Sequence, residues 1–262
     1  FLIGATSGRT TLNGEGLQHQ DGHSHILSST IPNCLSYDPA FSYEVAVIIK
    51  DGIQKMYVDQ ENYFYYITTT NENYEHPPMP KDSEEGIIKG MYKILGSKKS
   101  VIRLLGSGSI LRESIKARDI LSSYKIESEV WSVTSFNLLR KDGMEVERFN
   151  QLNPSSDEKK SYVEECFSIN PMPVIASTDY MRSYADQIRP YINEDFTVLG
   201  TDGFGRSDSR EMLREFFEID ANSIVRASAY SLYKSGNLEK DILDKIYKDI
   251  GVDSEKVNPW EA

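Results

Sequence analysis

The chain has 262 residues, of which 39% are hydrophobic and 26% are charged, and its formal net charge is −11. This composition excludes an intrinsically disordered chain, because the apolar fraction is sufficient for one large core or two smaller ones. No apolar run approaches the roughly 20 residues of a membrane-spanning helix, and no secretory signal is recognisable at Phe1. We therefore expect a cytoplasmic protein with no membrane partner.

The negative charge is concentrated in the first part of the chain. Residues 1–80 contain three basic side chains and nine acidic ones. Such a surface repels phosphate backbones, so we expect no nucleic acid partner. The two cysteines, Cys34 and Cys166, are far apart in apolar surroundings, which indicates buried free thiols rather than a disulfide or a metal pair.

The first 80 residues predict part of an α/β sheet. Residues 1–5 and 62–69 are rich in aromatic and β-branched types and are expected to form buried or half-buried strands. Residues 41–50 predict a helix that ends near Asp51-Gly52, where glycine suits a left-handed cap. Pro77, Pro78 and Pro80 then mark residues 71–83 as a linker. The expected domains are therefore 1–80, including this linker, and 81–262.

Strands and helices alternate after the linker. Strands are expected at 100–105, 129–133, 173–176 and 196–199, and helices at 110–124, 181–192, 224–232 and 238–247. A further helix follows Asp208 and Glu211, which have capping-box spacing, and carries one apolar stripe formed by Met212, Leu213, Phe216 and Phe217. The alternation predicts an α/β fold whose mostly parallel sheet is flanked by helices.

The most polar connection is residues 14–25, Gly-Glu-Gly-Leu-Gln-His-Gln-Asp-Gly-His-Ser-His, which we call the histidine loop. It holds three of the four histidines of the chain. Imidazole titrates near pH ~6.5, so a histidine here could exchange a proton with a substrate at neutral pH. Two other interpretations remain open at this point. The loop could bind zinc, or its histidines could simply be solvated. Zinc ligands would be His19, Asp21, His23 and His25.

Two glycine-rich connections also lie between a strand and a helix. Residues 106–109, Gly-Ser-Gly-Ser, could bring a phosphate to a helix N-terminus, but Leu111 replaces the third glycine of a dinucleotide motif. We expect a tight turn with serine capping there. Residues 200–210, Gly-Thr-Asp-Gly-Phe-Gly-Arg-Ser-Asp-Ser-Arg, are dense in glycine and charge. At the carboxyl end of the sheet they could contact a substrate or a partner subunit, and we expect the subunit interface.

The histidine loop carries a family resemblance. Residues 14–20, followed by Ile31-Pro32-Asn33, resemble the transketolase loop Asp-Gly-Pro-Thr-His-Gln-Pro and its downstream Pro-Asn. Blocks along nearly the whole chain resemble the homodimeric bacterial pyruvate dehydrogenase family, the first component of the pyruvate dehydrogenase complex. These blocks are residues 6–19, 31–33, 36–39, 71–74, 105–111, 176–180 and 200–210.

The resemblance implies an enzyme that uses thiamin diphosphate and magnesium to decarboxylate pyruvate. It also implies a homodimer that reductively acetylates the lipoyl domain of a partner dihydrolipoyl acetyltransferase. Residues 1–80 would then be the carboxyl-terminal part of the pyrimidine-binding (middle) domain, and 81–262 a transketolase carboxyl-terminal-like domain. By position, His19 would hydrogen-bond the covalent adduct and donate a proton, and Glu15 stands where transketolases have an aspartate for a substrate hydroxyl.

Departures from transketolase bear on the substrate. Ser7 occupies the place of a second transketolase histidine, and residues 68–70, Thr-Thr-Thr, replace an arginine for the sugar phosphate. A dianion needs a cationic partner, so a small 2-oxo acid fits better than a phosphorylated sugar. A transketolase-like sugar transferase, or a standalone interaction or regulatory module built from 81–262, are the alternative functions.

The family's magnesium-diphosphate motif is absent from this stretch of sequence. The chain has four Asp-Gly pairs, and none of them follows a glycine. The cofactor-activating glutamate is not identifiable either. The resemblance therefore implies a carboxyl-terminal part of a longer enzyme, with no cofactor-binding or metal residues of its own and no activity in isolation.

Overall fold

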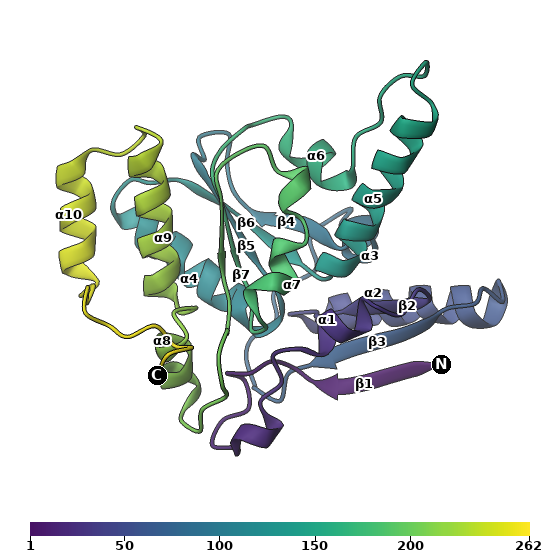
Figure 1. The fold of residues 1–262 in the computed structure, drawn as a ribbon, viewed down its shortest axis with the longest axis horizontal. Helices are drawn as coiled ribbons and strands as arrows, with labels where there is room; N and C mark the ends of the chain where they lie inside the picture. Colours follow the sequence, from purple (N-terminus) through teal and green to yellow (C-terminus); the bar gives the residue numbers. More distant parts are fainter.

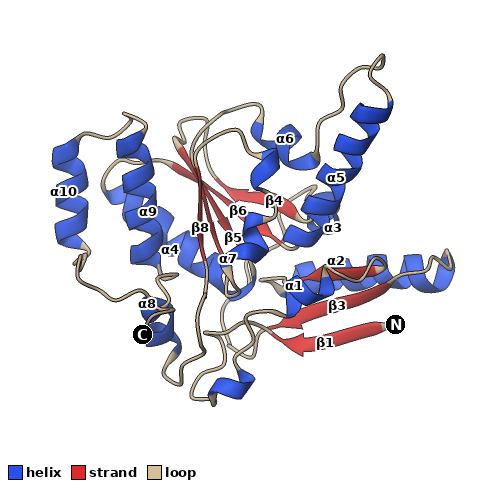
Figure 2. Ribbon diagram, in the orientation of Figure 1, coloured by secondary structure: helices blue, strands red, loops and turns tan.

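The computed structural model describes residues 1–262 as two sheets flanked by helices (Figures 1 and 2). The small sheet has the order β1-β3-β2, and its strands are all parallel. The large sheet has the order β4-β6-β5-β7-β8, and only β4 is antiparallel to its neighbour. The strands are β1 (Leu2–Thr6), β2 (Cys34–Tyr37), β3 (Phe64–Thr69), β4 (Met91–Leu95), β5 (Ile102–Gly106), β6 (Ser128–Val133), β7 (Val174–Ser177) and β8 (Phe196–Leu199). The expected α/β fold is confirmed.

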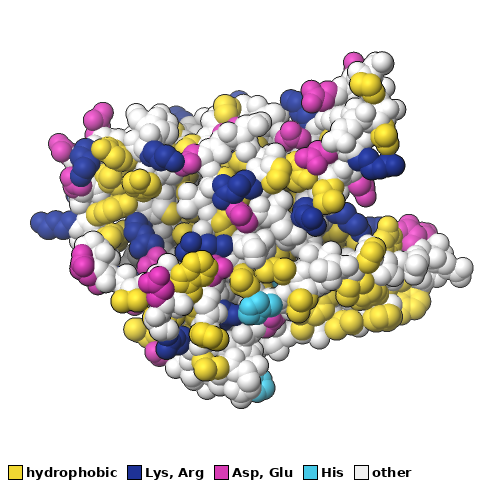
Figure 3. Space-filling model, in the orientation of Figure 1, with side chains coloured by type: hydrophobic (Ala, Val, Ile, Leu, Met, Phe, Trp, Pro, Cys, Tyr) yellow, Lys and Arg dark blue, Asp and Glu magenta, His cyan; other side chains and the backbone are white.

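The small sheet is centred on β3 because its aromatic and β-branched residues pack against α2 (Ser42–Ile53). Tyr65 and Ile67 of β3 form a core with Val47 and Ile48 of α2. The strand at residues 1–5 was expected to be buried or half-buried, which is wrong: Leu2 and Ile3 of β1 are 44% and 41% exposed. This strand lies at the edge of the sheet and has no neighbour on its outer side, and Figure 3 shows hydrophobic side chains along this border.

Helix α2 does not end at Gly52. It continues into a π-helical turn, η2 (Gln54–Val58), so the predicted left-handed cap is wrong. A Cβ on Gly52 would lie 3.3 Å from the ring of Tyr65. The glycine therefore permits close contact between helix and sheet, and the Tyr65 hydroxyl donates a hydrogen bond to Asp51 Oδ2 at 2.6 Å.

Residues 70–80 contain no helix or strand, as expected of the proline-rich connection, and lead to α3 (Glu84–Lys89). One face of the large sheet packs in an apolar cluster with α4 (Leu111–Ser123), α9 (Ala221–Lys234) and α10 (Lys240–Asp249). The other face packs with α5 (Phe136–Leu152), α6 (Tyr162–Phe167) and α7 (Arg182–Asp186). Figure 1 shows these two sets of helices on opposite sides of the sheet.

Three local predictions for the large sheet need correction. The helix expected at 181–192 is split into α7 and a 3-10 turn, η4 (Arg189–Tyr191), where Pro190 lacks an amide donor. Helix α8 (Arg210–Phe216) is capped by Ser209, whose Oγ accepts from Met212 N, rather than by Asp208. Met212 is 50% exposed, so the apolar stripe excludes it.

Both cysteines are free thiols, with Cys34 buried and Cys166 half-buried rather than fully buried. None of the helices combines the length and apolar character that crossing a bilayer requires.

The carboxyl ends of the two sheets meet at a buried junction. After β2, Asp38 donates its backbone N–H to Thr134 O (2.7 Å) and accepts from Gly108 N (3.0 Å). After β1, Arg9 N donates to Asp179 O, which follows β7 (3.1 Å). The connections that follow parallel strands of both sheets therefore lie together, at the edge where α/β proteins usually place their sites.

We expect Gly108→Ala to lower the free energy of unfolding by about 3 kcal/mol or more, because the residue combines two constraints. Its φ is +49°, and a Cβ would lie 2.5 Å from a carboxylate oxygen of Asp38. Gly236→Ala is the matched control, with φ +75° and no atom within 4 Å of the added Cβ. This control should lose only about 1 to 2 kcal/mol of unfolding free energy, the cost of placing alanine in a left-handed backbone conformation. Urea denaturation measures both variants. Equal losses of unfolding free energy would show that the clash with Asp38 adds nothing to the cost at position 108.

Candidate active site around the histidine loop

The histidine loop separates its three histidines rather than gathering them. His19 is exposed in a 3-10 turn, η1 (Leu17–His19), and His23 is exposed just before α1 (Ser24–Ser28). His25, within α1, is completely buried. No group of three or more His, Cys, Asp or Glu side chains in residues 1–262 is arranged to hold a metal ion. The geometry therefore does not support the zinc interpretation.

His25 belongs to the junction between the sheets. Its Nε2 lies 2.9 Å from Thr68 Oγ1, which donates to Asp38 Oδ1 at 2.7 Å. Its ring packs against the rings of Tyr180 and Tyr184, with centroids 4.7 and 4.9 Å away. Burial disfavours the imidazolium and lowers the pKa of His25 to about 3, so this side chain is neutral at physiological pH. We assign it a structural role.

Two buried carboxyl groups accompany His25. Burial raises the pKa of Asp38 to about 7, although hydrogen bonds from Thr68 and Ser107 oppose the shift. Burial also raises the pKa of Asp179. Thr10 donates to Asp179 Oδ1 from its backbone N (2.9 Å) and from Oγ1 (2.6 Å). Asp179 is therefore satisfied by donors that follow β1 of the opposite sheet. Asp38 accepts through Oδ1 from Thr68 of its own sheet, and its buried Oδ2 has no hydrogen-bond partner.

The predicted site residues, Glu15 and His19, lie on the exposed part of the loop. Their side chains form no hydrogen bond within the chain and are available to a ligand. The backbone on each side is fixed: Gly14 N donates to Asp208 O (3.1 Å), and the Gln20 side chain accepts from Arg206 N (2.6 Å). His19 is thus an accessible imidazole between two anchored positions.

The connection at 200–210 contacts residues 9–20 of the same chain, including part of the histidine loop, and its expected interface with a partner subunit stays a prediction. In addition to the contacts at Gly14 and Gln20, Arg210 Nε donates to Thr11 O at 2.9 Å. Arg9 Nη1 lies 2.5 Å from both Thr201 O and Gly203 O. Sequence reasoning missed these anchors because they join residues nearly 200 positions apart. The glycine density at 200–205 was the one available signal.

The turn at 106–109 is tight, as expected, but no serine side chain caps the following helix. Ser109 Oγ instead lies 2.7 Å from Thr11 Oγ1 and 3.4 Å from Asp179 Oδ2. The serines of this turn therefore contribute hydroxyl groups to the junction.

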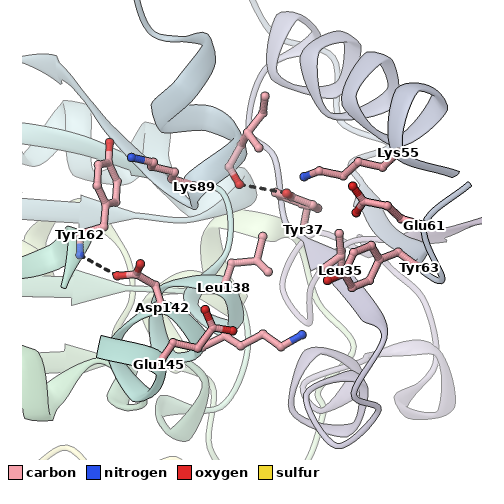
Figure 4. A pocket seen from close by; sticks show the side chains of 12 residues that line it. Leu35, Tyr37, Lys55, Glu61, Tyr63, Lys89, Leu138, Asp142, Glu145 and Tyr162 are labelled. Atoms are coloured by element: carbon pink, nitrogen blue, oxygen red, sulfur yellow. Dashed lines mark hydrogen bonds between the residues drawn. The ribbon is translucent and has the colours of Figure 1, made fainter. Parts of the chain in front are cut away.

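A separate pocket lies between the two sheets and α5, and contains neither Glu15 nor His19 (Figure 4). Lys55 and Glu61 enter it from the small-sheet side, opposite Lys89, Asp142 and Glu145 (Figure 4). Lys141 also lines the pocket, so three lysines face three carboxyl groups, and no residue of the histidine loop contributes to it.

Family comparison places this arrangement in a known class. Residues 90–220 match the family described as the transketolase-like TK C-terminal domain, and the chain belongs to that family. Residues 1–77 match the pyruvate dehydrogenase E1 component middle domain. The chain is 55% identical over 267 residues to the pyruvate dehydrogenase E1 component of Pseudomonas aeruginosa, covering 100% of this chain. It is 54% identical over 264 residues to that of Escherichia coli K12, covering 99% of this chain. It spans 30% of the length of each relative.

Solved transketolases share the fold. A transketolase variant from Pichia stipitis superposes with a TM-score of 0.67 at 18% identity, over 91% of this chain and 31% of that one. A split-gene transketolase, described as an inactive β4 tetramer, has a TM-score of 0.61 at 14% identity, over 88% of this chain and 67% of that one. These similarities confirm the transketolase-like architecture.

The residues of this chain do not by themselves fit a complete thiamin diphosphate site. The cofactor diphosphate needs a divalent cation held by oxygen ligands, and no cluster of carboxylates or histidines here is arranged to hold one. Of the two buried carboxyl groups at the junction, Asp179 is hydrogen-bonded through both oxygens and Asp38 through Oδ1, which leaves Asp38 Oδ2 as a single unpartnered oxygen.

We expect His25→Ala to destabilise the protein by about 3 kcal/mol, because it leaves a cavity among aromatic rings and removes the partner of Thr68. His19→Ala, six positions earlier on the exposed turn, should change stability by no more than about 0.5 kcal/mol. Thermal and urea unfolding of the two variants would check this. A larger loss for His19→Ala than for His25→Ala would contradict the division of roles.

Proposed function

We propose that this chain forms part of a thiamin diphosphate- and magnesium-dependent pyruvate dehydrogenase. The enzyme decarboxylates pyruvate and reductively acetylates the lipoyl domain of a dihydrolipoyl acetyltransferase, as a cytoplasmic homodimer. Residues 1–80 are the carboxyl-terminal part of its pyrimidine-binding domain with the linker, and 81–262 its transketolase carboxyl-terminal-like domain. The observation that carries the proposal is 55% identity to a pyruvate dehydrogenase E1 component along the entire chain.

Within this proposal, the histidine loop is one wall of the active site. His19 binds the reacting carbonyl group by a hydrogen bond and transfers a proton, and Glu15 supports substrate recognition. Exposure supports this assignment, since His25 is buried with a pKa lowered to about 3 and cannot reach a substrate. His19 combines access with an anchored backbone, which general acid catalysis requires.

The end of β3 argues against a sugar-phosphate transferase. Thr68 is buried and hydrogen-bonded to Asp38, and Ser7 is also buried. Two nearby arginines are paired with Glu72, at 2.5 Å for Arg112 and 2.9 Å for Arg214. A third arginine, Arg210, lies 3.7 Å from the same carboxylate. The strand end itself, Thr68 to Thr70, supplies hydroxyl groups and no cation for a phosphate dianion.

The junction argues against a standalone interaction module. Such a module would consist of residues 81–262 and would not need the upstream sequence. Yet the buried carboxylate of Asp179 takes its hydrogen bonds from Thr10 and Thr11. Residues 1–80 therefore supply both the donors and the cover of this carboxyl group, and residues 81–262 alone would leave this face of the junction open to water.

His19→Ala in the full-length enzyme should lower pyruvate turnover by about 10²-fold or more, the range of a lost general acid or base. His23→Ala is the matched control, because that imidazole is exposed on the same loop and its side chain forms no hydrogen bond. Steady-state and single-turnover measurements of decarboxylation and lipoyl acetylation would check this. Unchanged rates for His19→Ala would rule out the assigned role.

The isolated chain should be inactive and should bind thiamin diphosphate with magnesium more weakly than micromolar, because it offers no cluster of metal ligands. Isothermal titration calorimetry of the 262-residue chain, with the full-length enzyme as positive control, measures this binding. Micromolar binding by the chain alone would overturn the proposal of an incomplete site.

A further inference from the structure

The turn that carries His19 is held from outside its own sheet. On its amino-terminal side, Gly14 N donates to Asp208 O, and on its carboxyl-terminal side Gln20 Oε1 accepts from Arg206 N. Both partners belong to the 200–210 connection that follows β8 of the large sheet. The exposed segment with Glu15 and His19 is therefore fixed at both ends by the opposite unit of the fold.

Gln20 is the anchor adjacent to His19. Its side chain is 5% exposed, and its Oε1 lies 2.6 Å from Arg206 N. The connection packs closely on it, because a Cβ on Gly205 would lie 2.9 Å from the same Oε1. The Nε2 of Gln20 is buried and has no hydrogen-bond partner. The acceptor oxygen is therefore the functional end of this side chain.

Arg9 also links the 200–210 connection to the histidine loop. Its buried guanidinium donates to the carbonyl groups of Thr201 and Gly203. It also lies against the backbone of the loop, because a Cβ on Gly22 would be 2.5 Å from Arg9 Nη2. Arg9 thus joins the start of the 200–210 connection to the carboxyl-terminal half of the histidine loop.

We propose that Gln20 is a positioning residue for His19, and that it and Arg9 hold the imidazole in place through the 200–210 connection. The inference rests on the proposed function, because it assigns Gln20 an effect on turnover that is exerted through His19. Catalytic groups need placement within about 0.5 Å, and an exposed three-residue turn cannot provide this by itself. The large sheet thereby contributes to catalysis without contacting the substrate.

The test uses the full-length enzyme. Gln20→Met keeps the length of the side chain and removes the acceptor, and should lower kcat about three- to tenfold, as expected for one lost hydrogen bond, with little change in KM. Gln20→Glu restores an acceptor and should recover most of kcat. Gln18→Met is the matched control on the same turn, because Gln18 is exposed and forms no hydrogen bond.

A double-mutant cycle separates positioning from general damage. If Gln20 acts through His19, Gln20→Met should have no further effect on kcat in a His19→Ala background. The same three- to tenfold loss in both backgrounds would overturn the proposal. Wild-type kcat in Gln20→Met, or no recovery in Gln20→Glu, would overturn it as well.

Hydrogen–deuterium exchange keeps this inference separate from the proposed function. Amides at 14–22 should exchange about three- to tenfold faster in Gln20→Met than in wild type or Gln18→Met, whatever reaction the enzyme catalyses. If His19→Ala leaves turnover unchanged, the proposed role of His19 fails, and exchange alone decides whether the loop is anchored. Unchanged exchange in Gln20→Met would overturn the anchoring itself.

Discussion

The hydrogen bonds to buried Asp179 are the constraint on which the rest of the structure depends. This carboxyl group lies just beyond β7, is 1% exposed, and has to find donors because an unpaired buried charge is prohibitively costly. The donors are Thr10 and Thr11, which follow β1. Satisfying Asp179 therefore brings the carboxyl ends of the two sheets together, and the histidine loop begins directly after this contact.

Two other carboxyl groups of the small-sheet part, Glu44 and Glu72, also take their partners from the large-sheet part of the chain. Glu44 of α2 is fully buried and accepts from Ser132 and Tyr92 of the large sheet, each at 2.6 Å. Glu72, beyond β3, is paired with Arg112 and Arg214. Buried polar contacts of this kind contribute little net stability, but each requires one geometry. They give the two sheets a defined relative position, which an apolar contact of the same size would specify less well.

Local sequence patterns were sufficient for much of this fold and for the location of the candidate site. The strand at 196–199 has the predicted bounds, and the histidine loop was identified by composition alone. Strand β2 was missed because four residues carry too little periodicity. The different surroundings of His19 and His25 were also beyond local reasoning. His25 is buried by Tyr66, Tyr180 and Tyr184, which come from two distant parts of the chain.

The contact between Gln20 and Arg206 spans 186 positions in sequence. During synthesis, the histidine loop leaves the ribosome long before its partner does, and long-range contacts form late because loop closure must precede them. Until the 200–210 connection has emerged, Gly14 and Gln20 lack their partners and the turn with His19 is not anchored. The turn with His19 is thus made early and anchored last, so a nascent chain that lacks residues 200–210 has the histidine but not these anchors.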